Sequence, residues 1–325
     1  MNLKPRIAAA LLAVAGMIAA GPAAAAAESA ADYPSKPIRF ICTSAAGSPL
    51  DLMMRTTAKF LGDELKQTIV VENRTGGTGA VGMATAMNSP ADGYVIVSAT
   101  GSTSFLMADP KSSYSPDDFL FFRGLQAEPS AVAVRADSPY RTLGDLVKAL
   151  RETPDKVSVG GYAAAGFHQF VFYRLQQVGN FKAIWVPFQG GNQAALALMG
   201  KQIDAAVLTP SSALGQVQNG DMRLLGISTE KRDPTFPGVP TFKEQGLDVV
   251  ELLWRGLMVK KGTPPEIVAK LSAALDRVEA KPEWKAFMKA NAQSPVNLTA
   301  DQMQRHVVEE VASRRKFLQT IGVVK

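Results

Sequence analysis

Small and hydroxyl-bearing residues follow the first strand-like run of the sequence. The segment 43–51 reads Thr-Ser-Ala-Ala-Gly-Ser-Pro-Leu-Asp and lies between an apolar run at 37–43 and a helical period that begins at Leu50. Ser48 can cap this helix, and Asp51 follows three residues later, where a capping carboxylate can reach back. Free N–H groups at a helix start bind anions, so the segment is equally consistent with an anion-binding loop and with a helix that is simply well capped. Its candidate ligand residues are Ser44, Ala46, Gly47, Ser48 and Asp51.

Later junctions between a strand-like run and a helical period have the same chemical character. The hydroxyl-rich loop 98–104, the glycine- and alanine-rich loop 160–168, and the segments 186–192 and 208–212 offer neutral hydrogen-bonding groups, although each is also consistent with a plain polar turn. Ligands of open α/β sheets bind beyond the carboxyl ends of strands, where helices begin. His168 is open to ligand contact, but a partly exposed structural histidine is the favoured interpretation. The candidate ligand residues in these junctions are Thr100, Ser102, Thr103, Tyr162, Ala165, Gly166, Phe167, His168, Gln189, Gly190 and Thr209.

One motif of the sequence is typical of a dinucleotide-binding enzyme. Gly77, Gly79 and Gly82 match G-x-G-x-x-G between a strand-like run and a helical period. A dinucleotide site also needs an acidic residue about 20 positions further on, and the segment 99–102 contains none. The two histidines exclude a histidine-rich metal site, and neither a nucleophile–base pair nor a G-x-S-x-G elbow can be singled out. We therefore expect a glycine-rich turn, no catalytic residues, no metal site and no cofactor.

Strand-like and helical segments alternate over most of the chain, which predicts an α/β fold with largely parallel sheets. The strand-like runs fall at 37–43, 68–72, 94–99, 130–135, 156–160, 183–187, 203–208, 222–227 and 252–259. Helical periods fall at 50–65, 79–88, 142–151, 166–178 and 192–199, and the tail is helical at 265–279, 282–290 and 299–320. We expect lobe 1 to comprise residues 33–131 plus 247–325 and lobe 2 to comprise residues 132–246, with two crossings that form a hinge.

The segment 1–27 has the pattern of a cleavable secretory signal peptide. Lys4 and Arg6 precede an uncharged run from Ile7 to Ala20, and a Gly-Pro break leads into an alanine tract. The run is shorter than the roughly 20 residues of a transmembrane helix, so an uncleaved anchor is the less favoured alternative. The whole chain carries 35 basic and 29 acidic residues, a net charge of +6, and the basic residues are scattered. We therefore predict an exported protein that does not bind nucleic acid.

Several short sequence words occur in a characteristic order. They are Tyr33-Pro34-Ser35-Lys36-Pro37-Ile38, Val71-Glu72-Asn73-Arg74-Thr75-Gly76-Gly77-Thr78-Gly79, Pro90-Ala91-Asp92-Gly93-Tyr94, Val186-Pro187-Phe188-Gln189-Gly190-Gly191, Gly200-Lys201-Gln202-Ile203-Asp204, Pro237-Gly238-Val239-Pro240-Thr241-Phe242-Lys243-Glu244-Gln245-Gly246-Leu247 and Trp254-Arg255-Gly256-Leu257. Over residues 33–325 the chain resembles the receptors of tripartite tricarboxylate transporters, often called Bug proteins.

The resemblance implies an α/β, two-lobed periplasmic solute-binding protein of type II, a Venus flytrap with its ligand in the interlobe cleft. It implies a small organic anion as ligand, a periplasmic location and delivery to a transporter of two membrane subunits. In the family a carboxylate is held largely by backbone and water contacts from the first strand–helix loop, here Ser44 to Asp51, and the loops 100–103 and 161–168 match other ligand-facing loops. We expect a monomer. A flytrap sensor or accessory protein that signals ligand presence to a membrane partner is the alternative.

The chain departs from the family's pattern at two of these loops. Gly47 is followed by Ser48-Pro49 where the family usually has a second glycine, and proline removes a backbone N–H. In the second-lobe loop, alanines stand between Tyr162 and Phe167 where the family usually has more glycine and serine. We therefore predict a more apolar pocket, with Tyr162 or Phe167 near a ligand that is aromatic or bulky.

Overall fold

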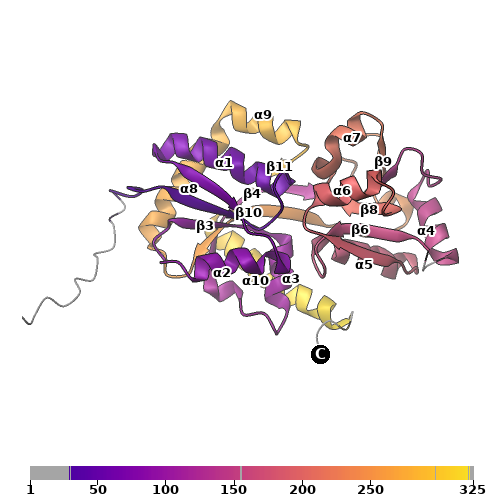
Figure 1. The fold of residues 1–325 in the computed structure, drawn as a ribbon, viewed down its shortest axis with the longest axis horizontal. Coiled ribbons are helices and arrows are strands. Elements are labelled where there is room, and N and C mark those ends of the chain that lie inside the picture. The colour runs from indigo at the N-terminus through magenta and orange to yellow at the C-terminus, as the bar shows by residue number, and fades with distance from the viewer. Residues whose placement is uncertain (1–28, 30, 154–155, 297, 321, 323–325) are drawn as a thin grey trace, which may run out of the picture.

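Two sheets, each covered by helices, give the protein two lobes that lie side by side (Figure 1). The structure is a computed structural model that describes residues 29, 31–153, 156–296, 298–320 and 322. Lobe 1 contains the six-stranded sheet, in the order β11-β4-β10-β3-β1-β2, and lobe 2 contains the five-stranded sheet, in the order β7-β6-β8-β5-β9. The chain has the two-lobed type II fold of solute-binding proteins, as predicted.

Lobe 1 is built from both ends of the chain. Its strands are β1 (Ile38–Cys42), β2 (Ile69–Asn73), β3 (Val95–Thr100), β4 (Phe119–Pro129), β10 (Leu252–Lys260) and β11 (Ser294–Pro295). Its helices are α1 (Pro49–Leu65), α2 (Ala80–Met87), α3 (Gly101–Ala108), α8 (Pro265–Ala280), α9 (Pro282–Ala290) and α10 (Ala300–Thr320). Every residue of β3 is buried, because β3 lies in the middle of the sheet with helices on both faces.

Lobe 2 is built from the middle of the chain. Its strands are β5 (Ala131–Arg135), β6 (Ser158–Tyr162), β7 (Ile184–Phe188), β8 (Ala205–Leu208) and β9 (Met222–Ile227). Its helices are α4 (Leu143–Glu152), α5 (Phe167–Gly179), α6 (Gly191–Met199) and α7 (Leu214–Gln218). The apolar strand β8 is entirely buried, as expected of a central strand that is covered on both faces.

Two segments connect the lobes, and they are hydrogen-bonded to each other. The chain leaves lobe 1 at the end of β4 and returns to it at the start of β10. Ser130 in the first segment donates its N–H to Ser228 Oγ at 2.7 Å, and Glu251 in the second donates its N–H to Ser228 O at 2.9 Å. Paired crossings of this kind are suited to a hinge. The residue limits proposed above for the two lobes stay a prediction.

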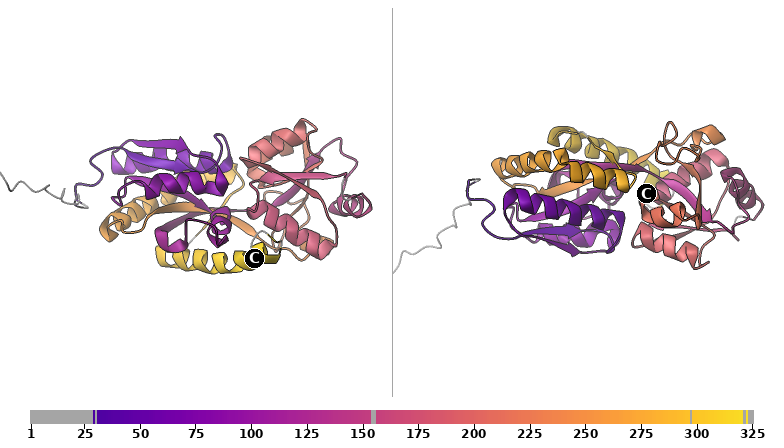
Figure 2. Two further views of the ribbon diagram at one scale, coloured as in Figure 1. Left: turned by 60° about the horizontal axis from the view of Figure 1, so that its bottom comes forward. Right: turned by 90° about the horizontal axis from the view of Figure 1, so that it is seen from above.

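The C-terminal helix α10 runs along lobe 1 and ends at the junction with lobe 2 (Figure 2). Phe317 near its end places its ring centroid 4.8 Å from that of Phe170 and 4.8 Å from that of Tyr173, both in α5. Arg314 bonds Glu251 at 3.2 Å, and Glu251 also bonds Arg174 of α5 at 2.7 Å. Helix α10 therefore holds α5 of the other lobe through aromatic and ionic contacts.

The prediction of largely parallel sheets was wrong. Strands β1, β2 and β3 are mutually parallel, but β10 runs antiparallel to both β3 and β4. In lobe 2, β6 is parallel to its neighbours whereas β5 is antiparallel to β8 and β9. The antiparallel strands β4, β5 and β10 are those that carry the chain between the lobes, so both sheets are mixed.

Candidate ligand-binding site between the lobes

Four helices begin at a single cavity between the lobes. Helices α1 and α3 follow β1 and β3 of lobe 1, and α5 and α6 follow β6 and β7 of lobe 2. Helix N-termini carry the positive end of the helix dipole, so their convergence favours an anion. The cavity encloses about 30 Å³ and is lined by Ser44, Ser48, Pro49, Leu50, Thr100, Ser102, Tyr162, His168, Gly191, Thr209, Ser212, Leu253 and Arg255.

The α1 end of the cavity is held in place by Asp51. Ser48 caps α1 by accepting a hydrogen bond from the Asp51 N–H at 3.3 Å. The Asp51 carboxylate accepts hydrogen bonds from Gly47 N at 2.9 Å, Arg55 Nε at 2.9 Å and Asn73 Nδ2 at 2.8 Å. Burial acts to raise the pKa of Asp51, but these hydrogen bonds outweigh it and the pKa lies below its ordinary value. Asp51 is therefore a buried anion that fixes the loop, and it lies outside the cavity lining.

The α3 end of the cavity is a loop of hydroxyl groups that cap their own helix. Thr100 Oγ1 accepts a hydrogen bond from Ser102 N at 3.0 Å, and Thr103 Oγ1 accepts one from Thr100 N at 3.0 Å. Ser102 Oγ accepts a hydrogen bond from Phe167 N of lobe 2 at 3.2 Å. The same loop thus satisfies the start of α3, contacts the opposite lobe and presents hydroxyl groups to the cavity.

The wall from lobe 2 is neutral and contains His168. The side chain is 2% exposed, and its Nδ1 lies 2.9 Å from Ser130 Oγ. Burial, assisted by the charge of Arg255, lowers the pKa of His168 to about 3, so the imidazole is uncharged at neutral pH. Burial likewise raises the pKa of Tyr162, which keeps its phenol protonated. The prediction of a partly exposed histidine was wrong, because α5 places His168 in the buried wall of the cavity.

The structure brings some of the candidate ligand residues to the cavity and places others elsewhere. Those that line it are Ser44, Ser48, Thr100, Ser102, Tyr162, His168 and Thr209. Those outside its lining are Ala46, Gly47, Asp51, Thr103, Ala165, Gly166, Phe167, Gln189 and Gly190. Phe167 is fully buried, with its ring edge-on to His168 at 5.5 Å between centroids, so it belongs to the apolar core. Of the two aromatic residues proposed to lie near a ligand, only Tyr162 is in the lining.

Direct contacts between the lobes close the cavity. Ala45 N and Ser44 Oγ each donate a hydrogen bond to Gln189 O at 3.3 Å, and Asn192 Nδ2 donates one to Ala46 O at 3.3 Å. Thr78 Oγ1, in the glycine-rich turn before α2, donates to Ala164 O at 3.3 Å. A cavity of about 30 Å³ holds a water molecule or two. We call this arrangement, in which the two lobes are hydrogen-bonded to each other beside the cavity, the closed form.

Sequence reasoning missed the charged residue of the cavity, Arg255. Its side chain is 3% exposed, and Nη1 is hydrogen-bonded to Glu128 Oε1 of β4, while Nη2 donates to Thr209 Oγ1 at 3.3 Å. Leu253 was also missed, whereas the other lining residues that were not among the candidates lie in segments expected to face the ligand, namely Pro49, Leu50, Gly191 and Ser212. The sequence did contain a signal for Arg255, since it stands inside an apolar strand-like run. A charged residue in such a place needs a buried partner, which indicates a special role.

The comparison with protein families decides the family. A model described as "Tripartite tricarboxylate transporter family receptor" matches residues 53–323. The chain belongs to this receptor family. A curated relative, Protein BugT of Bordetella pertussis, is 29% identical over 308 residues, 93% of this chain and 94% of that protein.

Solved structures agree with the receptor fold. That of periplasmic binding protein BugD has a TM-score of 0.84 and 25% identity, and the match covers 90% of this chain and 100% of that one. The structure of MatC from Rhodopseudomonas palustris with bound malate has a TM-score of 0.82 and 24% identity, and the match covers 87% and 99% of the two chains. At this identity the likeness to MatC shows the fold alone.

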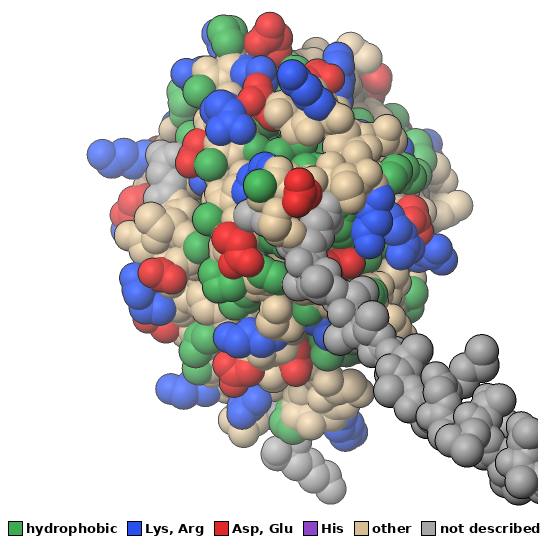
Figure 3. Space-filling model, turned by 90° about the vertical axis from the view of Figure 1, so that its left-hand side faces the viewer, with side chains coloured by type: hydrophobic (Ala, Val, Ile, Leu, Met, Phe, Trp, Pro, Cys, Tyr) green, Lys and Arg blue, Asp and Glu red, His purple; other side chains and the backbone are tan. Residues whose placement is uncertain are grey.

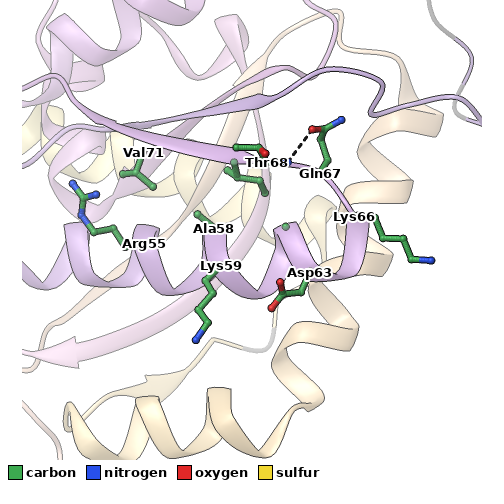
Figure 4. Close-up of a pocket in the computed structure, with 10 residues that line it drawn as sticks. Arg55, Ala58, Lys59, Asp63, Lys66, Gln67, Thr68 and Val71 are labelled. Atoms are coloured by element: carbon green, nitrogen blue, oxygen red, sulfur yellow. Dashed lines mark hydrogen bonds between the residues drawn. The ribbon is translucent and has the colours of Figure 1, made fainter.

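The outer surface of this receptor offers other hollows. The hollow in Figure 4, of about 760 Å³, lies between α1 and β2, and Arg55, Lys59, Asp63 and Lys66 are on its walls. Its charges are of both signs, and the lobe 1 end of the molecule likewise mixes acidic and basic side chains (Figure 3).

Within the described residues, no helix is long and apolar enough to span a membrane, and no cluster of three or more His, Cys, Asp or Glu side chains could hold a metal. The predicted signal peptide lies outside the described residues.

Proposed function

We propose that this receptor captures a small organic carboxylate between its lobes in the periplasm and delivers it, as a monomer, to a transporter of two membrane subunits. The observation that carries the proposal is the convergence of four helix N-termini, hydroxyl groups and Arg255 on one interlobe cavity. The helix dipoles, the hydroxyl groups and the Arg255 cation all favour an anion, so a carboxylate gains hydrogen bonds that offset its loss of water when the lobes close.

Two further observations support the proposal. The family is one of transporter receptors, and the solved relative MatC has malate bound. Most of the side chains that line the cavity are hydroxyl-bearing or small, and its aromatic rings are those of Tyr162 and His168. We therefore favour a small, highly oxygenated carboxylate over an aromatic or bulky one.

A thermal-unfolding screen tests the binding step. The protein without residues 1–27 is heated with malate, succinate, citrate, glutamate, nicotinate, benzoate and phthalate, with neutral sugars as controls. A ligand that binds only the native state stabilises it by mass action, by about 2.7 kcal/mol when its concentration is 100 times its Kd. The temperature at the midpoint of unfolding rises as a result. A shift with one class of carboxylate supports the proposal. The proposal is contradicted if a neutral solute shifts the midpoint and none of the carboxylates does.

An uptake experiment tests the delivery step. Cells that express the receptor with its two membrane subunits are given the labelled carboxylate found in the screen. Uptake that depends on all three proteins supports transport. Binding without receptor-dependent uptake would instead support the sensory role that the sequence leaves open.

A further inference from the structure

Arg255 is the one cation among the residues that line the cavity, and it is held by a buried anion. Glu128, in the neighbouring strand β4, is 0% exposed and accepts the hydrogen bond from Arg255 Nη1 through Oε1. Gln293 Nε2 donates to the same oxygen at 3.1 Å. Charges buried this deeply are stable only when paired, so Glu128 and Gln293 fix the orientation of the guanidinium.

The cavity side of Arg255 is occupied by a weak partner. Arg255 Nη2 contacts the neutral hydroxyl of Thr209, in the opposite lobe, at a long 3.3 Å. A guanidinium carries five N–H donors in a planar fork that matches a carboxylate, and such charged bonds are about twice as strong as neutral ones. An acidic group in the cavity would therefore displace the Thr209 hydroxyl as the partner of Arg255.

The order of strands places Arg255 apart from the α1 end of the cavity. Arg255 is paired with Thr100 of β3, and β3 separates β10 from β1, which leads into the Ser44–Ser48 loop. Neighbouring strands lie about 4.8 Å apart, so the ends of β1 and β10 are separated by about 10 Å. Side chains that reach inward from both positions leave a span comparable to a short linear dicarboxylate.

We propose that Arg255 is a specificity-determining residue that recognises a second acidic group of the ligand, while the first is held at the start of α1. The inference rests on the proposed carboxylate-binding function. It follows that the receptor prefers an acid to the corresponding amide at the β10 end, because an amide gains no charged hydrogen bond from the guanidinium.

Glu128 is a positioning residue that also limits the strength of this recognition. Its carboxylate competes with an acidic group of the ligand for the Arg255 guanidinium. Its second oxygen, Oε2, is buried without a hydrogen-bond partner in the described structure. The change Glu128→Gln keeps a hydrogen-bonding oxygen beside Arg255 but removes the competing negative charge. A merely structural role for the pair predicts weaker ligand binding in this variant, whereas the proposal predicts tighter binding of the diacid.

The test is calorimetric titration of the protein lacking residues 1–27 with succinate, malate, glutarate and adipate, and with the monoamide of each that binds. A charged hydrogen bond contributes a factor of about 10 to 100 in affinity, so we expect the wild-type protein to prefer the diacid by that factor. Glu128→Gln should increase the preference. The double variant Glu128→Gln/Arg255→Gln, which buries no unpaired charge, should reduce it to about threefold or less, and Arg255→Lys should retain part of it. Circular dichroism and thermal unfolding establish that each variant is folded.

The outcomes separate this inference from the proposed function. Equal affinity of wild-type protein for diacid and monoamide, or a preference that survives in the double variant, overturns the role of Arg255 while carboxylate binding stands. Failure of every carboxylate to bind overturns both.

Discussion

The Nδ1 atom of His168 lies 2.9 Å from the Oγ of Ser130, so a side chain that lines the cavity is joined directly to a segment that connects the lobes. Ser130 is in turn bonded to Ser228, and Ser228 to Glu251 of the second connection. The contact therefore ties the first turn of α5 to both crossings of the chain. We infer that the position of His168 changes together with the angle between the lobes.

The buried state of His168 predicts a specific dependence of stability on pH. Its pKa is about 3 in the folded protein, below the ordinary value of 6.5, so the unfolded chain binds a proton first as the pH falls. The contribution of neutral His168 to the free energy of unfolding is complete above pH 6.5. It is lost as the pH falls from about 6.5 to 3, with a slope of up to about 1.4 kcal/mol per pH unit. Urea unfolding across this range should show a flatter profile for His168→Asn than for wild-type protein. Parallel profiles would contradict the buried, neutral assignment.

The contacts of α10 with α5 predict that the C-terminal helix stabilises the closed form. Phe317→Leu keeps an apolar side chain but loses the ring contacts with Phe170 and Tyr173. We expect a severalfold weaker carboxylate affinity and a larger radius of gyration in solution scattering without ligand, because closure is coupled to binding. The matched control is Lys316→Ala, an exposed position on the same turn, which should behave as wild type. Identical affinity and radius for Phe317→Leu would show that these contacts do not bias closure.

Gly256 in β10 predicts a local limit on side-chain size. A Cβ at this position would clash with the backbone oxygen of Arg123 in β4, at the place where the register of the two strands shifts. Gly256→Ala should therefore reduce the free energy of unfolding by about 1–3 kcal/mol. Gly215→Ala is the control, because nothing lies within 4 Å of a Cβ there, and alanine in helix α7 should be neutral or stabilising by up to about 1 kcal/mol. Denaturant unfolding of both variants measures the difference, and equal stabilities would contradict the close β4–β10 approach.

Much of the fold followed from local patterns. The predicted strands at 37–43, 94–99 and 222–227 are present within two residues of their observed limits, as is the helix at 282–290. The sequence reasoning missed β4 and α3. Helix α3 begins with Gly-Ser-Thr-Ser, residues of low helix propensity, and it forms because its hydroxyl groups cap it and its other residues are buried against α10. Strand β4 is formed by its pairing with β10, a segment more than 100 residues away, which no local pattern reveals.

The residues of the candidate site likewise fall into those that the local sequence could predict and those whose role depends on distant partners. The hydroxyl residues Ser48, Thr100 and Ser102 could be located because they stand at strand–helix junctions, where the sequence itself places ligand-binding loops. The role of Arg255 depends on Glu128 and Thr209, which come from a distant strand and from the other lobe. The burial of Phe167 likewise depends on contacts between the lobes rather than on its own loop.

A reversible lock between the lobes tests the central claim, that a carboxylate binds inside the interlobe cleft. A Cβ added at Gly190 would lie 3.3 Å from the Cβ of Ala45 in the opposite lobe, close to the separation that a disulfide needs, once the Asn192 side chain, 2.6 Å away, has rotated. The variant Ala45→Cys/Gly190→Cys is prepared with Cys42→Ala, which removes the buried native thiol, and is titrated by calorimetry with the carboxylate that binds the wild-type protein. We predict that the oxidised protein does not bind and that reduction restores binding to within a few-fold of the Cys42→Ala control. Full affinity in the oxidised form would contradict the account, because it would place the ligand outside the cleft.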